Sequence, residues 1–261
     1  MEILTAVLCV GGIGIAFGIL LAVASKFFAV EKDPRLDEIT EALPGANCGG
    51  CGYAGCANMA AAILEGSVPV SGCPVGGETV SAKIAEIMGV GVTETERTTA
   101  VVLCSGNCGE DRFNYEGITD CLAAANLAGG SKNCRYACMG LGTCVSVCPF
   151  GAISVENGVA NVDEDKCKSC GKCVAACPKH IIKIVPYDRK VEVKCSSKDK
   201  GIVTKNSCET GCIGCKMCER NCEAEAVKVV DNCAVIDYSK CTGCGICADK
   251  CIRKTIIRRR G

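Results

Sequence analysis

The chain has 261 residues, of which 27 are cysteine, none is tryptophan and 4% are aromatic, and its 29 basic side chains balance 29 acidic ones. Because bulky side chains are scarce, we expect bound metal to supply much of the folding free energy. Reduced thiols in this number exclude a protein exported to an oxidising compartment. The zero net charge indicates no particular class of partner, and the length allows one to three domains.

The N-terminal segment carries no charged residue over positions 3–25. At about 1.5 Å per residue a helix of this length crosses the ~30 Å hydrocarbon layer, so we predict a transmembrane anchor over residues 1–30. Lys26, Lys32 and Arg35 follow it and, by the positive-inside rule, predict a single-pass protein of the cytoplasmic (inner) membrane with the bulk of the chain on the cytosolic side. A cleaved signal peptide is the alternative, but the apolar run exceeds the usual ~7 to 15 residues.

A four-cysteine module is predicted over residues 31–78. Its cysteines are Cys48, Cys51, Cys56 and Cys73. Glycines lie beside the first three of them, so backbone without side chains can approach an inorganic cluster, and we predict one [4Fe-4S] site here. A zinc site is the alternative, because four thiolates also bind zinc tetrahedrally.

Nine cysteines of the C-terminal half recur after a constant shift of 74 residues, which indicates an internal duplication. The pairs are Cys121 with Cys195, Cys134 with Cys208, Cys138 with Cys212, Cys144 with Cys218, Cys148 with Cys222, Cys167 with Cys241, Cys170 with Cys244, Cys173 with Cys247 and Cys177 with Cys251. We therefore predict two tandem units, a first over residues 104–190 with an N-terminal extension and a second over residues 191–261.

The predicted fold class is α+β, with a transmembrane helix, a small helical module and two units of short hairpins and helices. Residues 57–65 are rich in alanine and predict a helix closed by Gly66. A second helix is predicted over residues 79–88, at the start of a connecting segment of residues 79–103. Asn157 and Gly158 predict a two-residue hairpin turn that the second unit repeats.

The motif C-x2-C-x2-C-x3-C carries the chemistry of both units. Three thiolates on one loop bind three irons of one [4Fe-4S] cube, and the fourth reaches the neighbouring cube. The four predicted ligand sets are Cys148 with Cys167, Cys170 and Cys173; Cys134, Cys138 and Cys144 with Cys177; Cys222 with Cys241, Cys244 and Cys247; and Cys212, Cys215 and Cys218 with Cys251. Zinc knuckles need no third cysteine at this spacing, and disulfide scaffolds belong to short secreted chains.

Seven cysteines remain after these five sites are supplied: Cys9, Cys104, Cys108, Cys121, Cys195, Cys208 and Cys233. A sixth cube is predicted at the junction of the units, held by Cys104, Cys108 and Cys121 with Cys195 or, in its place, Cys208. Two alternatives stay open, namely free thiols and a rearranged set in which Cys121 displaces Cys134. Leu141 aligns with Cys215, so we expect the first unit to recruit Cys134 in its place, whereas Cys215 completes the motif of the second unit and releases Cys208. Cys9 and Cys233 are interpreted as packed apolar residues.

The segment LPGANCGGCGYAGC, with the later GCP, resembles the four-cysteine iron-sulfur module of the B subunit of the Rnf complex. An N-terminal helix, this module and then ferredoxin-type motifs follow the order found in that family, so the resemblance covers essentially the whole chain. The second unit departs from the ferredoxin pattern, because Glu223 and Ile252 stand where the first unit has Pro149 and Pro178.

The resemblance implies an electron-relay subunit of an ion-translocating ferredoxin:NAD oxidoreductase. Such a subunit accepts electrons from reduced ferredoxin and passes them to partner subunits that reduce NAD or another acceptor and export sodium or protons. The resemblance also implies that this chain carries [4Fe-4S] clusters, that it binds neither flavin nor NAD, and that nucleic acid is not a partner. The alternatives are a polyferredoxin subunit of a membrane hydrogenase or heterodisulfide-reducing system and, from another class, a membrane-anchored zinc-binding scaffold.

Overall fold

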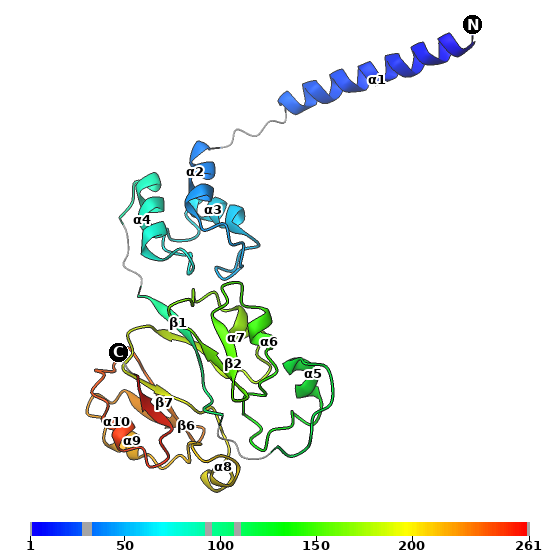
Figure 1. Ribbon diagram of the computed structural model, residues 1–261. Helices are drawn as coiled ribbons and strands as arrows, with labels where there is room; N and C mark the ends of the chain where they lie inside the picture. Colours follow the sequence, from blue (N-terminus) through cyan, green and yellow to red (C-terminus); the bar gives the residue numbers. More distant parts are fainter. Residues whose placement is uncertain (1, 28–32, 92–95, 107–110, 260–261) are drawn as a thin grey trace.

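Helices come first along the chain, and paired strands follow (Figure 1). The structure is a computed structural model, and it describes all residues except 1, 28–32, 92–95, 107–110 and 260–261. The α+β content agrees with the predicted fold class. Cys108, predicted as a ligand of the sixth cube, lies outside the described residues.

The first helix, α1 (Glu2–Phe27), covers the segment for which we predicted a membrane anchor. Among the residues that the structure describes, no helix combines the length and the apolar character that a membrane crossing requires. The predicted transmembrane anchor over residues 1–30 is therefore wrong, and so is the predicted single-pass localisation in the cytoplasmic membrane.

Three helices form the N-terminal module, which we define as residues 33–91. They are α2 (Pro34–Ala42), α3 (Cys56–Leu64) and α4 (Gly77–Met88). Their apolar faces bury Ile39, Met59, Ile63 and Ile84 against one another. The helix α4 ends at Gly89, whose φ of 65° is a left-handed conformation that favours glycine. The two helices predicted in this region are confirmed.

The first unit, residues 97–186, is built on two antiparallel strand pairs. These are β1 (Thr98–Val102) with β4 (Ile182–Pro186), and β2 (Ile153–Glu156) with β3 (Val159–Val162). Its helices are α5 (Cys121–Asn126), α6 (Thr143–Ser146) and α7 (Lys172–Ala176). Asn157 and Gly158 both have positive φ, as a type I′ turn requires, and the predicted hairpin is confirmed.

The second unit, residues 191–259, repeats this arrangement. Its strand pairs are β5 (Val191–Val193) with β8 (Ile256–Arg258), and β6 (Val227–Val230) with β7 (Cys233–Ile236). Its helices are α8 (Gly201–Ser207), α9 (Met217–Arg220) and α10 (Ile246–Asp249). The hairpins align after the 74-residue shift, since Val159 and Cys233 each begin the second strand of their hairpin.

The 74-residue shift does not relate equivalent positions at the start of the two units. The strand β1 pairs with β4 as β5 pairs with β8, and Cys104 follows the end of β1 by two residues, as Cys195 follows the end of β5. Cys104 is therefore the spatial counterpart of Cys195, although the shift aligns Cys195 with Cys121. The first unit has 29 residues between Cys104 and Cys134, against 12 between Cys195 and Cys208, and α5 lies in the longer stretch.

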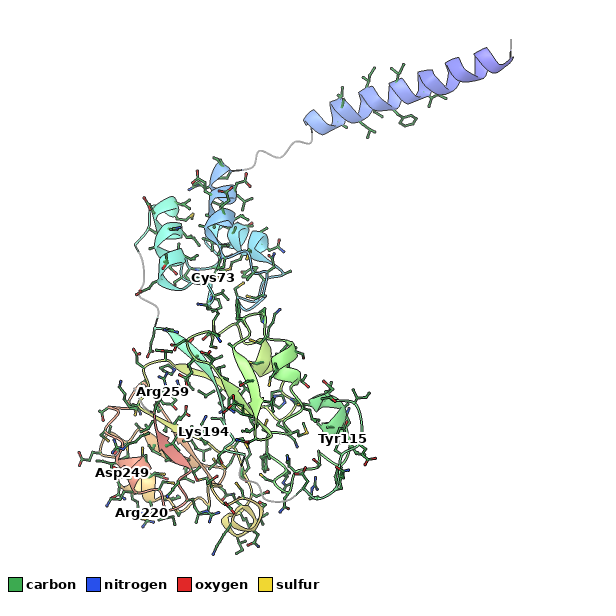
Figure 2. The ribbon with its side chains drawn as sticks, in the orientation of Figure 1. Cys73, Tyr115, Lys194, Arg220, Asp249 and Arg259 are labelled. Atoms are coloured by element: carbon green, nitrogen blue, oxygen red, sulfur yellow. The ribbon has the colours of Figure 1, made fainter. Side chains whose placement is uncertain are left out.

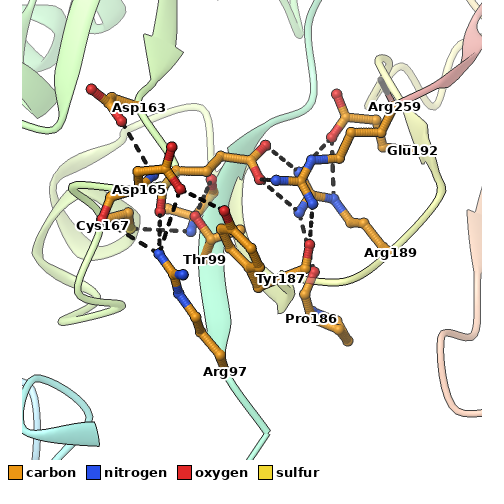
Figure 3. Close-up of polar contacts among 12 residues, drawn as sticks. Arg97, Thr99, Asp163, Asp165, Cys167, Pro186, Tyr187, Arg189, Glu192 and Arg259 are labelled. Atoms are coloured by element: carbon orange, nitrogen blue, oxygen red, sulfur yellow. Dashed lines mark hydrogen bonds and ion pairs between the residues drawn. The ribbon is translucent and has the colours of Figure 1, made fainter. Parts of the chain in front are cut away.

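A polar cluster joins the two units (Figure 3). The side chain of Arg189 is fully buried, and its Nη2 lies 2.7 Å from Glu164 of the first unit and 2.7 Å from Glu192 of β5. Arg259, next to β8, pairs with Glu164 as well. The ring of Tyr187 has Arg97 at 3.7 Å and Arg259 at 4.7 Å from its centre. We call these residues the inter-unit clamp, because they tie the start of the first unit to the end of the second.

Candidate iron-sulfur sites

The cysteines of the N-terminal module surround one cavity. Its thiols are Cys48, Cys51, Cys56 and Cys73. Asn47 positions the loop, because its Oδ1 accepts the backbone N–H of Cys56 at 2.8 Å. Cys73 is buried at the end of the module that faces the paired strands (Figure 2). Burial raises the pKa of the Cys73 thiol.

In the first unit, the loop before α7 and the remote cysteine before β2 enclose a second cavity. Its thiols are Cys148, Cys167, Cys170 and Cys173, the set predicted from the motif. Backbone amides point at two of the sulfurs. The N–H of Ala100 donates to Cys167 Sγ at 3.4 Å, and the N–H of Ala152 donates to Cys148 Sγ at 3.4 Å.

A third cavity, also in the first unit, differs from the prediction in one thiol. It is lined by Cys121, Cys138, Cys144 and Cys177. Cys134 was predicted here and lies elsewhere. Cys121 begins α5, and a polar network anchors it: its N–H donates to Thr143 Oγ1 at 2.6 Å, and that hydroxyl donates to Asp120 at 2.8 Å. Asp120 also caps α5 by accepting the N–H of Ala123 at 2.9 Å.

The second unit contains two sets as predicted from the motif. One cavity is lined by Cys212, Cys215, Cys218 and Cys251. The other set gathers around Cys247, whose pKa is raised to about 11 by burial and by the neighbouring thiols Cys241, Cys222 and Cys244. Cys244 is exposed, whereas its counterpart Cys170 is partly covered.

A further cavity lies between the units. Its thiols are Cys104, Cys134, Cys195 and Cys208. Two come from each unit, and Cys134 and Cys208 are related by the 74-residue shift. Ser105 and Thr210 are hydrogen-bonded across the boundary, and Arg253 donates to the carbonyl of Cys208 at 2.5 Å. Relative to the predicted sixth set, Cys134 enters, Cys195 and Cys208 are both present although they were predicted as alternatives, and Cys121 lies in the third cavity. Cys108, also predicted here, lies outside the described residues.

The exchange of Cys121 and Cys134 has a local cause. Cys215 lies on its motif loop in the second unit, but Leu141 occupies the matching place in the first unit. The insertion that carries α5 delivers Cys121 to that cavity. Cys134 then stays in one packed cluster with Ala137, Cys104 and Cys208. This is the rearranged set that the sequence left open.

The chemistry of these sets suits bound iron-sulfur clusters. Burial, reinforced by neighbouring thiols, raises the pKa of Cys144 to about 12 and that of Cys173 and Cys218 to about 11. An isolated thiolate is disfavoured in such surroundings, and iron supplies the positive charge that lets the thiol release its proton. Within the described part of the chain, no three metal-binding side chains are grouped as a single ion would require.

Close contacts connect one set to the next. A Cβ on Gly50 would lie 2.7 Å from the carbonyl oxygen of Cys170, so only glycine lets the module loop approach this closely. The N–H of Cys138 donates to Cys104 Sγ at 3.5 Å, and the N–H of Cys212 donates to Cys195 Sγ at 3.4 Å. The last two bonds are equivalent in the two units and flank the inter-unit cavity.

One further cysteine, interpreted from the sequence as a packed apolar residue, lies at these contacts. Cys233 is 7% exposed and packs in the same apolar cluster as Cys195 and Cys212, and its Sγ donates to the carbonyl oxygen of Cys195 at 3.3 Å. The neighbouring Cys233 thiol lowers the pKa of Cys195 to about 7 and that of Cys212 to about 6. The only signal in the sequence was a cysteine aligned with Val159, which is equally well explained by apolar packing.

Family models match three parts of the chain. An iron-sulfur cluster family matches residues 43–75, a 4Fe-4S dicluster domain matches residues 137–181 and a 4Fe-4S binding domain matches residues 234–256. The chain therefore binds [4Fe-4S] clusters, and one match falls in the module and one in each unit.

Curated relatives match nearly the full length. The B subunit of the Na(+)-translocating ferredoxin:NAD(+) oxidoreductase complex of Acetobacterium woodii is 49% identical over 95% of this chain and 76% of its own length. The B subunit of the ion-translocating oxidoreductase complex of Methanosarcina acetivorans is 44% identical over 98% of both chains. The B subunit of the proton-translocating ferredoxin:NAD(+) oxidoreductase complex of Clostridium ljungdahlii is 44% identical over 92% of this chain and 86% of its own.

Proposed function

The chain belongs to the B-subunit family of ion-translocating oxidoreductase complexes, and from this premise we propose how its cysteines serve electron transfer. The family expected from the motifs is confirmed at 44–49% identity over most of the chain. The protein is an electron-transfer subunit of such a complex and works with other subunits of it. When bound, a [4Fe-4S] cluster takes up and releases single electrons at a potential that its surroundings set.

We propose that the chain holds six [4Fe-4S] clusters. The proposed ligand sets are Cys48, Cys51, Cys56 and Cys73; Cys148, Cys167, Cys170 and Cys173; Cys121, Cys138, Cys144 and Cys177; Cys104, Cys134, Cys195 and Cys208; Cys212, Cys215, Cys218 and Cys251; and Cys222, Cys241, Cys244 and Cys247. Support comes from the five cavities that four thiols each line and from the thiols around Cys247. No other residue class supplies ligands in this assignment.

The six sets follow one another in a single series. The module adjoins the first unit where Gly50 meets Cys170. On either side of the inter-unit set, a backbone N–H donates a hydrogen bond to one of its sulfurs: that of Cys138 to Cys104 and that of Cys212 to Cys195. Within each unit, the motif loop supplies three thiols to one set and the fourth to its neighbour. The inter-unit set, which has two thiols from each unit, is therefore the link on which exchange between the units depends.

The electron donor we propose is reduced ferredoxin, and its entry point is the set that contains Cys244. The names of two relatives include ferredoxin and NAD(+). Cys244 is exposed, and residues 191–261 carry 14 Lys and Arg against 9 Asp and Glu, whereas residues 31–90 carry 3 against 8. A net positive charge on the unit that carries an exposed set favours encounter with an acidic carrier protein.

Iron and acid-labile sulfide counts on the anaerobically purified chain test the assignment. Six sets predict about 24 iron atoms per chain. Cys208→Ala removes a ligand of the inter-unit set and should lower the count by about four. Ferredoxin should then still reduce the second unit at the wild-type rate, whereas reduction of the first unit and the module should slow. If ferredoxin reduced every set of this variant at the wild-type rate, the proposed series of sets would be contradicted.

Charge reversal tests the entry point. Lys240 precedes Cys241, and Lys250 precedes Cys251, and both are exposed. The double variant Lys240→Glu and Lys250→Glu should lower the rate of reduction by ferredoxin about tenfold at low salt and converge with wild type at high salt. Lys205→Glu with Lys198→Glu makes the same charge change near α8, away from Cys244, and serves as the matched control. Equal slowing in both double variants would contradict entry at Cys244.

A further inference from the structure

The exposed ligand loop of the second unit has a basic side chain on each side of Cys244. Arg258 of β8 covers Gly245, which is buried, and a Cβ on this glycine would collide with the Arg258 guanidinium. The side chain of Lys190 covers Gly243, where a Cβ would lie 2.8 Å from the Lys190 Cγ. The two glycines have φ of 74° and 79°, a conformation that favours glycine, so the loop has no side chain beneath either cation.

The guanidinium of Arg258 is held in one orientation. Its Nε donates to Asp249 Oδ1 at 3.0 Å, and its Nη2 donates to Asp249 Oδ2 at 2.5 Å. Its Nη1 donates to the carbonyl oxygen of Cys244 at 3.3 Å. The Arg258 side chain is nevertheless 52% exposed. These bonds use three of the five N–H groups of the guanidinium, so an incoming carboxylate can bind it without displacing Asp249.

The first unit has neutral side chains in place of these three charged ones. The 74-residue shift and the pairing of the first and last strands give the counterparts: Ile184 for Arg258, Ala175 for Asp249 and Thr99 for Lys190. A Cβ on Gly171, the counterpart of Gly245, would meet no atom within 4 Å. The loop of Cys170 is contacted instead by Gly50 of the N-terminal module. The charged cover thus belongs to the loop whose cysteine faces solvent.

We infer that Arg258 and Lys190 form a docking site, at which a carboxylate of the acidic electron-carrier protein binds beside Cys244. The inference deepens the proposed function and rests on it, because it requires that electrons enter at the set that contains Cys244. The planar fork of an arginine matches the geometry of a carboxylate, and both cations are exposed to an approaching protein. Asp249 is a positioning residue, which holds the guanidinium over the loop.

The direct test uses an acidic two-cluster bacterial ferredoxin and the cluster-loaded full chain. The rate of reduction is measured against the concentration of reduced ferredoxin. Arg258→Ala should raise the half-saturating concentration roughly five- to tenfold and leave the limiting rate unchanged, because a charge-assisted contact is lost. Arg258→Lys keeps the charge without the planar fork and should recover only part of the affinity. Dithionite, a small reductant that needs no docking site, should reduce both variants as fast as wild type.

Asp249→Ala separates a built docking site from general attraction between charges. This variant removes a negative charge, so attraction by net charge alone predicts faster reduction at low salt. Loss of a preorganised guanidinium predicts the opposite, a rise of about threefold in the half-saturating concentration.

Arg220→Ala is the matched control. Arg220 is exposed as well, and its Nη2 donates to the carbonyl oxygen of another ligand, Cys215, at 3.0 Å. The change of charge and the lost bond to a ligand loop are therefore the same as in Arg258→Ala, but the loop belongs to the neighbouring set. The half-saturating concentration of ferredoxin should equal that of wild type.

Zero-length cross-linking gives a second readout on the unaltered chain. A carbodiimide joins a lysine amine to a carboxylate that touches it, and mass spectrometry of the joined peptides should identify Lys190 linked to ferredoxin. Lys205 in α8 is exposed too and should not be linked. Linkage at Lys205 without linkage at Lys190 would contradict the docking site.

Three kinetic outcomes would overturn the inference and leave entry at the Cys244 set intact. They are wild-type affinity in Arg258→Ala, equal weakening in Arg220→Ala, and tighter binding by Asp249→Ala. If Arg258→Ala loses iron, Lys190→Glu decides, because it reverses an exposed charge and should raise the half-saturating concentration about tenfold. A wild-type chain that dithionite reduces but ferredoxin does not would instead overturn the proposed donor.

Discussion

The first and second units share their strand pairs, hairpin turns and most thiol positions, yet they complete one set in different ways. In the second unit Cys215 lies on the same loop as Cys212 and Cys218. In the first unit Cys121 reaches the cavity from the start of α5, in an insertion that the second unit lacks. A thiol that is absent from the loop is thus replaced by one from a distant segment. The difference shows that equivalent cavities can be lined by thiols from non-equivalent positions in the sequence.

The units also differ at their outer ends. The loop of Cys170 contacts Gly50 of the N-terminal module, whereas the loop of its counterpart Cys244 is exposed. The same motif loop is therefore an internal junction in one unit and a surface in the other. The following variants test these differences, beginning with the largest expected effect.

Cys121→Ala should remove one cluster, and Leu141→Cys in the same chain should restore it. Leu141 matches Cys215, so a cysteine there supplies the thiol that the first unit lacks on its loop. The expected change is a loss of about four iron atoms and four sulfides per chain in the single variant and recovery in the double variant. Iron and sulfide analysis measures both.

The control for this rescue is Cys134→Ala with Leu141→Cys. Cys134 lines the inter-unit cavity, so the added thiol is in the wrong place to replace it. Its iron content should stay low. Rescue of Cys134→Ala, with none for Cys121→Ala, would show that the predicted set with Cys134, Cys138, Cys144 and Cys177 is the true one.

Arg189→Leu should loosen the two units from each other. The buried guanidinium pairs with Glu164 and Glu192, and removing it leaves Glu192, which is 6% exposed, with Lys194 as its remaining cation. Breaking a buried pair costs about 3–5 kcal/mol of stability. Thermal unfolding of the cluster-loaded protein measures the loss.

Arg135→Ala is the matched control for the clamp. Arg135 and Asp199 also bridge the two units, but the Arg135 side chain is 68% exposed, so its ion pair contributes little. An equal loss of thermal stability in both variants would mean that burial does not make the clamp ion pairs more stabilising than the exposed pair.

Gly50→Ala should weaken the contact between the module and the first unit. The new Cβ would lie 2.7 Å from the carbonyl oxygen and 2.9 Å from the Cα of Cys170, and overpacking of this kind costs about 1–3 kcal/mol. We expect slower electron exchange between the module and the first unit in flash-reduction experiments. Gly91→Ala, where a Cβ meets no atom within 4 Å, should behave as wild type.

Asp120→Ala should produce the smallest effect, confined to the set with Cys121. The N–H of Ala123 and the hydroxyl of Thr143 hold the pKa of Asp120 below its usual value. Its stabilising bonds are therefore present above the unfolded pKa of about 3.9 and are lost as the pH falls through the lower folded pKa. Chelators should remove iron from this set several-fold faster in the variant than in the wild-type protein. The rate of iron loss from the Cys212 set should be the same in both and serves as the internal control.

The sequence by itself determined the local parts of this protein. Three cysteines spaced by three residues share one loop whatever surrounds it, so the motif loops could be assigned to separate sets before any coordinates. The hairpin at Asn157 and the end of α4 at Gly89 follow from backbone conformations that few other residues adopt. The thiols predicted for the module and for three sets of the two units do lie together in the structure.

Only the tertiary structure decided the thiols that come from far along the chain. The 74-residue shift aligned Cys195 with Cys121, but strand pairing shows that Cys104 is the spatial counterpart of Cys195. The insertion in the first unit places Cys121 in another cavity. The predicted membrane anchor is a second correction: a count of apolar residues predicted it, but among the described residues no helix has the length and apolar character to cross a bilayer. Pairing of strands and burial of side chains depend on the whole chain, and no local pattern encodes them.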